Sequence, residues 1–156
     1  PDPKKIVAIR NYSKPQTVKE IRAFIGLVGY YRRFIKNFAE IAKPLTELTK
    51  KEIKFDWEIK QEDAFKILKE YLCIEPILKY PDVSKPFVLS TDASSVAIGA
   101  ILSQVHNGQE HPVAYASRQL NKSERNYSTT ERELLALVWA TKYFRCYLYG
   151  RKFTVI

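Results

Sequence analysis

The sequence has few of the residues that cross-link small proteins, and it lacks the long apolar runs that cross membranes. It has no methionine and only two cysteines, Cys73 and Cys146, which lie far apart and form no Cys-x-x-Cys pair. This favours neither a disulfide framework nor a zinc site and is typical of a reducing compartment. No apolar run approaches the roughly 18 residues of a membrane span, and the N-terminus has no signal-peptide core. Because the chain starts at Pro1 without a methionine, we expect a segment of a longer product.

Acidic residues are scarce at the start of the chain. Residues 1–36 hold nine Lys and Arg against two acidic residues, a net charge of +7 within a total of +9. Tyr and Phe are interleaved with these cations, which suits a polyanion such as nucleic acid. A basic surface that is simply solvated is the alternative. With 156 residues, 46% of them hydrophobic, the chain can bury a core as one or two domains.

Helical patterns dominate the first half of the chain. Prolines at positions 1, 3 and 15 leave room for one short helical turn around Lys4 to Arg10. Thr17 then caps a helix that we expect to run through VKEIRAFIGLVGYYRRFIKNF, with Glu20 at the capping-box position. Its core stripe at helical spacing consists of Ile21, Phe24, Ile25, Val28 and Ile35.

A second face of this predicted helix carries Arg22, Gly26, Tyr30 and Arg33. A glycine inside a helix costs about 1 kcal/mol relative to alanine, so it needs a reason. Close approach of another backbone, from protein or from nucleic acid, would supply one. Tight packing of a neighbouring helix of the same chain on Gly26 is the alternative.

Two more helices are predicted before residue 75. IAKPLTELTKK is expected to form a short helix broken at Pro44, and IKFDW a short strand or an extended segment. QEDAFKILKEYL then forms a helix. Its apolar residues at helical spacing are Ala64, Phe65, Leu68 and Leu72.

The pattern changes to strands after the proline-rich stretch EPILKYPDVSKPF, so we place a domain boundary near residue 80. PFVLSTD and VAIGAILSQ are short apolar runs, and Asn107-Gly108 is a hairpin signal before HPVAYASRQL. These runs predict a three-stranded antiparallel meander. A long helix over NYSTTERELLALVWATKYFRCYLYG, ended by Gly150, follows, and RKFTVI starts a fourth strand. The predicted fold class is α+β.

A carboxylate, Asp92, ends the first apolar run of this region. It can cap the Ser-rich turn that follows, or it can bind a hard cation. In the next helix Ser128 and Glu131 form a capping box, which gives Glu131 a structural role and leaves Glu133 without one. Two facing carboxylates repel unless a cation lies between them, so Asp92 and Glu133 can hold Mg²⁺. A Glu133 at a solvated helix edge is the alternative.

Glu133 is expected to border the apolar stripe of its helix. That stripe consists of Leu134, Leu137, Val138, Thr141, Phe144 and Leu148. His106 and His111 flank the hairpin turn without a third ligand, so we expect them to be solvated loop residues. The aromatic residues of TKYFRCYLYG are expected to pack in the core and at the helix end instead of stacking on bases.

The order of these segments resembles the Pol polyprotein of gypsy-class LTR retrotransposons, most of all elements from insects. VLSTDAS, GAILSQ, PVAYASRQL and NYSTTERELLALVWA are similar to the N-terminal part of the ribonuclease H (RNase H) domain. TVKEIRAFIGLVGYYRRFIKNFAEIAKPLTELTKK, FDW, AFKILKEYL and PILKYPD are similar to the thumb and connection region of reverse transcriptase. The resemblance implies a thumb/connection region over residues 1–80 and a truncated RNase H-like domain over residues 81–156.

This resemblance implies that Asp92 and Glu133, the latter in a Glu-Leu-x-Ala motif, are catalytic and metal-binding carboxylates. In the family, two Mg²⁺ (or Mn²⁺) ions activate a water and stabilise the leaving oxygen as the RNA strand of an RNA/DNA hybrid is cut. A third carboxylate, in a Thr-Asp that continues RKFTVI, and a fourth lie further along the family's sequence. The isolated chain, which also lacks the polymerase fingers and palm, is therefore expected to be inactive or nearly so.

The thumb resemblance implies contacts with nucleic acid. The residues that would follow the minor groove of the primer-template are Arg22, Gly26 and Tyr30, and those that would neutralise phosphates are Arg32, Arg33 and Lys36. The implied partners are an RNA/DNA hybrid, the primer-template duplex and the rest of Pol: polymerase fingers and palm, the remainder of RNase H, protease and integrase. No membrane partner is implied, and the implied location is intracellular, in a cytoplasmic virus-like particle. The alternatives are a non-catalytic nucleic-acid or protein binding module and a purely structural connection domain.

Overall fold

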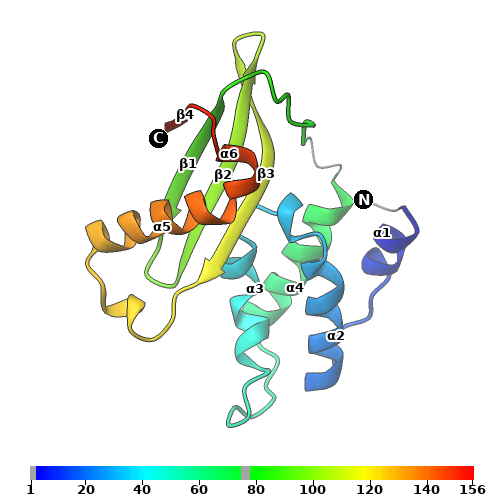
Figure 1. The fold of residues 1–156 in the computed structure, drawn as a ribbon. Helices are drawn as coiled ribbons and strands as arrows, with labels where there is room; N and C mark the ends of the chain where they lie inside the picture. Colours follow the sequence, from blue (N-terminus) through cyan, green and yellow to red (C-terminus); the bar gives the residue numbers. More distant parts are fainter. Residues whose placement is uncertain (1–2, 75–77) are drawn as a thin grey trace. The chain divides into compact units, whose positions relative to one another are not determined.

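The chain forms two compact units, Pro1–Pro76 and Ile77–Ile156, in a computed structural model that describes residues 3–74 and 78–156. The described part of the first unit contains helices without strands, and the second combines a sheet with helices (Figure 1). This order confirms the predicted α+β class. The naming of the units as thumb/connection and RNase H-like domain, with a boundary near residue 80, stays a prediction.

The described residues of the first unit form four α-helices and one 3-10 helix. They are α1 (Pro3–Arg10), α2 (Val18–Gly29), η1 (Arg32–Phe34), α3 (Phe38–Glu47) and α4 (Ile59–Cys73). The predicted stripes form one core, in which the rings of Phe24 and Phe65 pack 4.7 Å apart between centroids. Burying each large apolar side chain here contributes about 1.5–3 kcal/mol. The expected core residues Ile21, Val28 and Ile35 are fully buried, and Ile25 is half-buried.

The helix predicted to run from Thr17 to residue 38 is shorter than expected. Thr17 Oγ1 accepts the N–H of Glu20 as predicted, but α2 ends at Gly29 and Tyr30 is its C-cap. η1 follows, and Asn37 adopts a left-handed conformation (φ 56°) before α3 begins. Asn tolerates this conformation better than most residues, so it favours a turn between η1 and α3. Hydrophobic periodicity alone does not predict this turn.

The break predicted at Pro44 is absent, because α3 runs through this residue. The proline removes one backbone N–H from the helix. Ala42 and Leu45 on either side of it are fully buried, so packing on the core outweighs that loss. IKFDW forms no strand: residues 54–58 have no regular structure and lead directly into α4.

A four-stranded sheet in the order β3-β2-β1-β4 is the centre of the second unit. The strands are β1 (Phe87–Ala93), β2 (Ala97–His106), β3 (Gln109–Gln119) and β4 (Phe153–Val155). β1, β2 and β3 form the predicted antiparallel meander, and β4 pairs parallel with β1. The β2–β3 turn has both residues at positive φ, Asn107 at 52° and Gly108 at 77°, as its sequence predicts.

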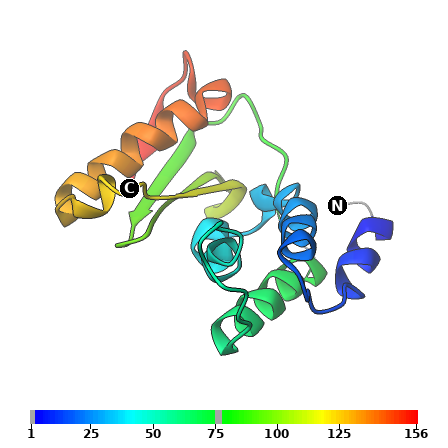
Figure 2. The same cartoon turned by 90° about the horizontal axis from the view of Figure 1, so that it is seen from below.

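The helix after the meander packs on one face of the sheet, as Figures 1 and 2 show for α5 (Thr129–Tyr143). A short 3-10 helix, η2 (Glu124–Asn126), precedes it, and α6 (Arg145–Leu148) follows. The single long helix that was predicted is therefore wrong, because the backbone leaves helical geometry at Phe144 (ψ 18°). Phe144 is buried with Phe87 and Leu89 of β1, so core packing accompanies the break.

The buried face of α5 differs in part from the predicted stripe, since Leu137, Phe144 and Leu148 pack in the core as predicted. Ala136 and Ala140 are fully buried, whereas Leu134 and Val138 are 58% and 52% exposed. Small residues let the helix backbone approach the sheet closely, and the larger leucine and valine are then turned outward. Glu133 lies on the buried side, one turn before Ala136, instead of at the edge of an apolar stripe.

A buried amide fixes the segment that precedes β1. Gln104 of β2 is fully buried, and its Oε1 accepts the N–H of Asp82 at 2.8 Å. Its Nε2 donates to the carbonyl oxygens of Asp82, at 2.8 Å, and Lys85, at 3.1 Å. One side chain thereby satisfies three backbone groups and holds the entry to the central strand against its neighbour.

Candidate nucleic-acid face and carboxylate pair

Three residues share one exposed face of α2. Arg22 and Gly26 lie one turn apart on the helix, and Tyr30 follows one turn later with helical backbone angles (φ −59°, ψ −30°). All three are exposed, Tyr30 to 73%. Arg22 Nη2 donates to the carbonyl oxygen of Thr49 at 3.0 Å, which holds part of its guanidinium while other donors of the group stay available.

Gly26 lies open on this face. A Cβ placed on it would meet no atom of the described chain within 4 Å. Packing of a neighbouring helix on Gly26, one of the two explanations that the sequence left open, therefore does not account for this glycine. Gly29 lies half-buried on the same helix, and a Cβ there would contact the ring of Phe38 at 3.9 Å.

The three further cations predicted to contact nucleic acid follow α2. Because the helix ends at Gly29, Arg33 does not continue the helical face of Arg22, and that part of the prediction is wrong. Arg32 lies over the ring of Phe38 at 5.6 Å, and Arg33 over the ring of Phe34 at 5.5 Å. Both are exposed, as is Lys36, so all three cations lie on the surface next to the end of α2.

The turn after β1 shows which residue caps it. Ser94 Oγ accepts the backbone N–H groups of Val96 and Ala97, at 3.2 and 3.1 Å. Asp92 is exposed in the last part of β1, and its carboxylate accepts no hydrogen bond from the described residues. The turn-cap explanation for Asp92 is therefore wrong, since the serine two residues later has that role.

The first turns of α5 lie at the same end of the sheet as Asp92. Ala136 packs in a cluster with Ile98 of β2 and Ala93 of β1, so Glu133, one turn earlier, lies over this end. Arg132 Nη1 donates to the carbonyl oxygen of Ser94 at 3.1 Å and ties the same turn to the end of β1. The residues of β1 that face α5 alternate along the strand with Asp92, so Asp92 lies on the other face of the sheet. No hydrogen bond joins Asp92 to Glu133 in the described structure. The described residues contain no cluster of three or more metal-ligating side chains.

The capping box at the start of α5 is formed. Ser128 Oγ accepts the N–H of Glu131 at 3.3 Å, and Glu131 Oε2 accepts the N–H of Ser128 at 2.7 Å. The hydrogen bond from the backbone N–H of Ser128, followed by one from its side chain, lowers the pKa of Glu131. The two glutamates near the start of α5 thus differ in role, because Glu131 is held at the helix end, whereas Glu133 is half-buried one turn before Ala136.

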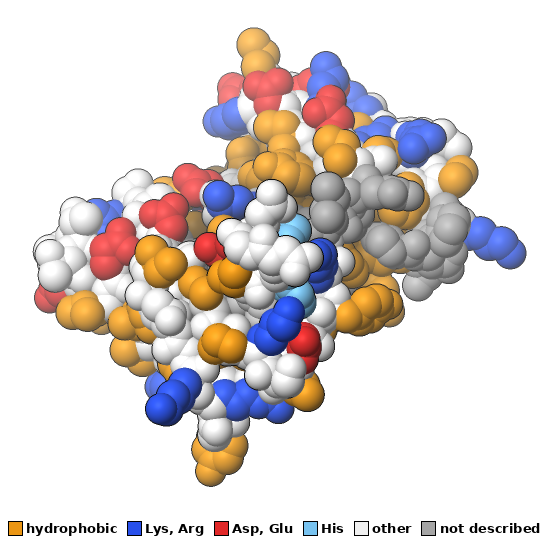
Figure 3. All heavy atoms as spheres, turned by 90° about the horizontal axis from the view of Figure 1, so that it is seen from above, with side chains coloured by type: hydrophobic (Ala, Val, Ile, Leu, Met, Phe, Trp, Pro, Cys, Tyr) orange, Lys and Arg blue, Asp and Glu red, His pale blue; other side chains and the backbone are white. Residues whose placement is uncertain are grey.

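The two histidines are strand residues, so the expectation of solvated loop residues is wrong. His106 ends β2 and His111 lies in β3, both are half-buried, and their rings lie 5.9 Å apart. His106 Nδ1 lies 3.2 Å from Lys85 Nζ, and Figure 3 shows histidine side chains (pale blue) beside cationic ones. Burial, then the charges of Lys85 and Lys79, lower the pKa of His106, which favours its neutral form.

The sequence reasoning missed an ion pair that braces the segment before α5. Arg118 Nη1 and Nη2 donate to Glu124 Oε2 and Oε1 at 2.8 and 2.9 Å, and the guanidinium lies over the ring of Trp139 at 6.0 Å. Glu124 also accepts the N–H of Asn121 at 2.9 Å. Residues 118 and 124 are six apart across a loop, a spacing that carries no periodic signal.

Acid should weaken the second unit through this pair. The hydrogen bonds from Arg118, followed by the N–H of Asn121, lower the pKa of Glu124 below its usual 4.5. The pair therefore stabilises the fold fully above pH 4.5, and this contribution is lost as the pH falls through the lowered pKa. We expect Glu124→Gln to flatten the decline of the free energy of unfolding below pH 4.5, measured by urea denaturation. Glu52→Gln, on the surface of the first unit, is the control, and equal slopes for both variants would contradict the prediction.

Comparison with known proteins places the chain in a family. A family profile described as RNase H-like domain found in reverse transcriptase matches residues 57–155. The chain belongs to this reverse transcriptase family. It is 54% identical, over 99% of its length, to the retrovirus-related Pol polyprotein from transposon 297 of Drosophila melanogaster, and 45% identical, over 97%, to that from transposon gypsy of the same species. The predicted gypsy-class Pol family is thus confirmed, and the chain spans only 14% and 15% of these two polyproteins.

Solved reverse transcriptases share the fold. The foamy viral protease-reverse transcriptase dRH in complex with double-stranded DNA has a TM-score of 0.82 and 25% identity, covering 98% of this chain and 27% of that one. The foamy viral protease-reverse transcriptase in complex with an RNA/DNA hybrid has a TM-score of 0.80 and 25% identity, covering 98% and 21%. Within the part of this reverse transcriptase segment that the structure describes, no helix has the length and apolar character needed to cross a membrane.

Proposed function

We propose that this segment binds the primer-template duplex and the RNA/DNA hybrid through the face of Arg22, Gly26 and Tyr30. We propose further that Asp92 and Glu133 supply part of a two-metal RNase H site. The observation that carries the proposal is the open space over Gly26 on an exposed, basic and aromatic helix face. That two similar structures hold double-stranded DNA and an RNA/DNA hybrid supports the choice of ligand.

Close approach of a nucleic-acid duplex to the helix would explain why residue 26 is a glycine. A duplex backbone or groove floor can approach a helix most closely where no side chain projects. Arg22 and Tyr30, one turn to either side, supply a cation and an aromatic ring for phosphate and sugar. Arg32, Arg33 and Lys36 extend the positive surface past the helix end and would neutralise further phosphates. Shape and 2′-OH contacts, not base edges, would distinguish RNA from DNA here.

The carboxylate pair suits Mg²⁺ or Mn²⁺ in its chemistry. Carboxylate oxygens are the ligands that these ions prefer, and neither Asp92 nor Glu133 has a competing hydrogen-bond role in the described structure. When bound, the ions would supply an activated water and charge stabilisation for the leaving oxygen. Asp92 and Glu133 would hold and orient them at the end of β1.

The register of β4 supports the proposal of a third carboxylate. Val155 pairs with Leu89, and Thr91 donates its N–H to the carbonyl oxygen of Ile156 at 3.3 Å. Continuing this parallel register, the second residue after Ile156 would come level with Asp92. Two carboxylates alone compensate only half of the charge of two divalent metal ions, so we propose that the chain by itself cleaves hybrid poorly or not at all.

Replacing Gly26 by alanine should raise the stability of the protein and weaken its binding to a hybrid. We expect Gly26→Ala to raise the free energy of unfolding by about 1 kcal/mol, because alanine favours the helix and has free space. The same change should weaken binding of an RNA/DNA hybrid about tenfold, since a methyl at a close approach displaces the backbone that it meets. Fluorescence anisotropy at a stated salt concentration measures the affinity, and thermal denaturation measures the stability.

Gly29→Ala is the matched control for this test. It lies in the same helix but on the half-buried side, in ordinary contact distance of Phe38. We expect unchanged hybrid affinity for this variant. If Gly26→Ala binds as tightly as the wild type, the proposed face is wrong. A non-catalytic protein binding module would bind no hybrid in either variant.

The proposal also includes the partners of the chain and its location in the cell. Its partners would be the remainder of Pol, namely the polymerase fingers and palm, the rest of RNase H, protease and integrase. Its location would be intracellular, in a cytoplasmic virus-like particle. Membership in the gypsy-class Pol family supports both statements.

A further inference from the structure

The last part of the chain is rich in cations and has no acidic side chain. Residues 134–156 contain Lys142, Arg145, Arg151 and Lys152 and no Asp or Glu. All four cations are exposed, and none forms an ion pair with a carboxylate of the described residues. They lie in the last turn of α5, in α6 and in the turn before β4, at the end of α5 that is opposite to Glu133 (Figure 1). A surface with charge of one sign attracts a polyanion.

An exposed aromatic ring lies on this surface. The expectation that the aromatic residues of TKYFRCYLYG pack in the core holds for Phe144 and Tyr147, whose ring centroids lie 6.2 Å apart. Tyr149 is 76% exposed instead. The guanidinium of Arg145 lies over its ring, 5.2 Å from the centroid, and covers one face of the ring. The other face of a ring that is so exposed is open to a flat ligand.

A tight turn brings a second guanidinium beside this ring. Gly150 has a φ of 71°, a conformation that favours glycine, and the N–H of Arg151 then donates to the carbonyl oxygen of Leu148 at 3.1 Å. Arg151 Nη1 donates to the carbonyl oxygen of Tyr147 at 3.5 Å, which holds the side chain against α6. A guanidinium has five donors, so most of those of Arg151 remain available for phosphate oxygens.

We propose that this α6 surface binds single-stranded nucleic acid. Arg145, Arg151 and the neighbouring lysines contact the phosphates, and an unpaired base stacks on the open face of Tyr149. Cations beside exposed aromatic rings are the combination that binds single strands with little sequence preference. A duplex fits this surface less well, because its bases are already stacked on one another and offer no face to the ring. The site uses none of the residues of the proposed hybrid-binding face.

The position of the α6 surface keeps it separate from the proposed carboxylate site. The ten residues from Glu133 to the end of α5 span about 15 Å. A strand bound at the α6 surface would therefore lie along the helix from Glu133 without occupying the place of a metal ion.

The two cysteines report on this proposal within one molecule. Cys146 lies in α6 between Arg145 and Tyr147 and is exposed, whereas Cys73 belongs to the first unit and is half-buried. The probe is an oligothymidylate of about 12 nucleotides, and an abasic strand of equal length, with the same phosphates but no bases, is the matched control ligand. The rate of iodoacetamide labelling at each cysteine is measured by peptide mass spectrometry. At ten times its Kd, the oligothymidylate should slow labelling of Cys146 about tenfold and leave Cys73 unchanged.

Replacement of the ring tests the stacking contact. Tyr149→Leu keeps an apolar side chain on the surface and should weaken binding of the oligothymidylate about tenfold, measured by fluorescence anisotropy. The abasic strand should bind the wild type about tenfold more weakly than the oligothymidylate and should bind Tyr149→Leu as it binds the wild type.

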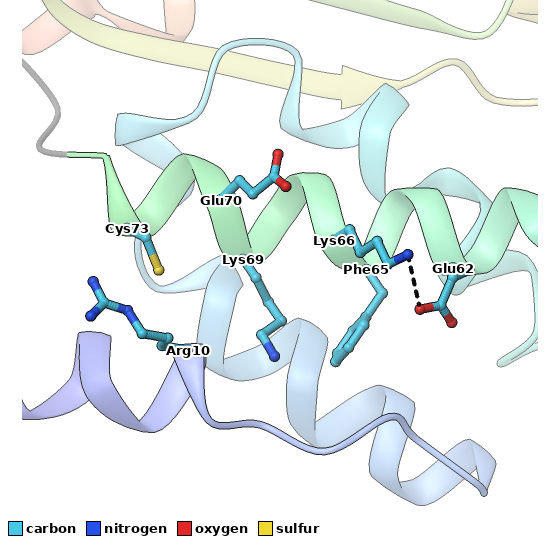
Figure 4. Close-up of a pocket in the computed structure, with 7 residues that line it drawn as sticks. All are labelled: Arg10, Glu62, Phe65, Lys66, Lys69, Glu70 and Cys73. Carbon is cyan, nitrogen blue, oxygen red and sulfur yellow. Dashed lines mark ion pairs between the residues drawn. The ribbon is translucent and has the colours of Figure 1, made fainter.

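Replacement of the cations tests the phosphate contacts. Arg145→Gln combined with Arg151→Gln should lower the slope of log Kd against log salt concentration by about 1.4, since each phosphate contact to a single strand contributes about 0.7. Lys50→Gln combined with Lys66→Gln removes the same net charge and is the matched control. Both lysines already have carboxylate partners in the first unit, at 2.9 Å and, for Lys66 with Glu62 in Figure 4, at 3.8 Å. This control should leave the slope unchanged.

Four outcomes would overturn the proposal. They are labelling of Cys146 that the oligothymidylate does not slow, equal affinity for the abasic strand, no effect of Tyr149→Leu, and equal slopes for the two double variants. Protection of Cys146 by phosphatidylserine vesicles but not by the oligothymidylate would assign the surface to a membrane and also overturn it. Gly26→Ala should not change binding of the oligothymidylate, so failure of the hybrid-binding face and failure of the α6 surface are distinguishable.

Discussion

Replacing Glu133 by glutamine should abolish hybrid cleavage in a chain that carries the rest of the RNase H domain. We expect a longer chain, continued past Ile156 with the sequence of a homologous Pol polyprotein, to cleave the RNA of a labelled hybrid when Mg²⁺ is present. Even residues that only support metal ligands change activity 10–100-fold, so loss of a ligand should lower the rate at least about 100-fold. Asp92→Asn should have an effect of the same size.

Glu131→Gln is the control for the loss of Glu133. It lies two residues away on the same helix, but its carboxylate accepts the N–H of Ser128 at the helix start. We expect this variant to lose about 0.3–1 kcal/mol of stability, because glutamine can still accept the N–H of Ser128 but has no negative charge at the helix start, and to keep most of its cleavage rate. Full activity of Glu133→Gln would show that the carboxylate at the start of α5 holds no metal. The chain ending at Ile156 should show no cleavage above background, and Mg²⁺-dependent cleavage by it would refute the proposal of an incomplete site.

Replacing Gln104 by alanine should cost the second unit on the order of 3 kcal/mol of unfolding free energy, about 1 kcal/mol for each hydrogen bond lost. The side chain is fully buried and satisfies backbone groups of Asp82 and Lys85. Its removal leaves these groups without partners and opens a cavity, and both effects act in the same direction. Thermal or urea denaturation, followed by circular dichroism, measures the change.

Gln109→Ala tests whether the effect is specific to the buried amide. Gln109 begins β3 on the other side of the hairpin turn and is exposed. A surface change of this kind should stay within about 0.5 kcal/mol of the wild type. Equal stability of the two variants would mean that the segment before β1 is held by other contacts. Gln104→Glu should also destabilise, because it removes the two donated hydrogen bonds.

The sequence predicted most strongly those elements whose pattern is local. The hairpin at Asn107-Gly108 and the stripes of α2 and α4 follow from turn chemistry and helical spacing, which depend on near neighbours. The continuity of α3 through Pro44 depends on burial against other helices, and periodicity does not show it. The inward-facing side of α5 was assigned wrongly only at Leu134 and Val138, because a face of two alanines looks weaker than one of leucine and valine.

For the candidate sites too, the sequence indicated some features and only the structure showed the others. The residue types of Asp92 and Glu133 indicated a carboxylate pair, but only the hydrogen bonds of Ser94 show that Asp92 is not the turn cap. Gly26 was open to two explanations until the space around it was known.

The pairing of β4 with β1 has a consequence for the order in which the second unit forms. Phe87 pairs with Phe153, so the whole meander and α5 are synthesised between the two partners. Closing a loop of this length costs chain entropy before any contact compensates for it, whereas the β2–β3 hairpin closes over two residues. On the ribosome the hairpin and α5 can therefore assemble first, and β1 keeps one unpaired edge until the last strand emerges. During that interval the free edge of β1 is a surface on which another copy of the chain can pair.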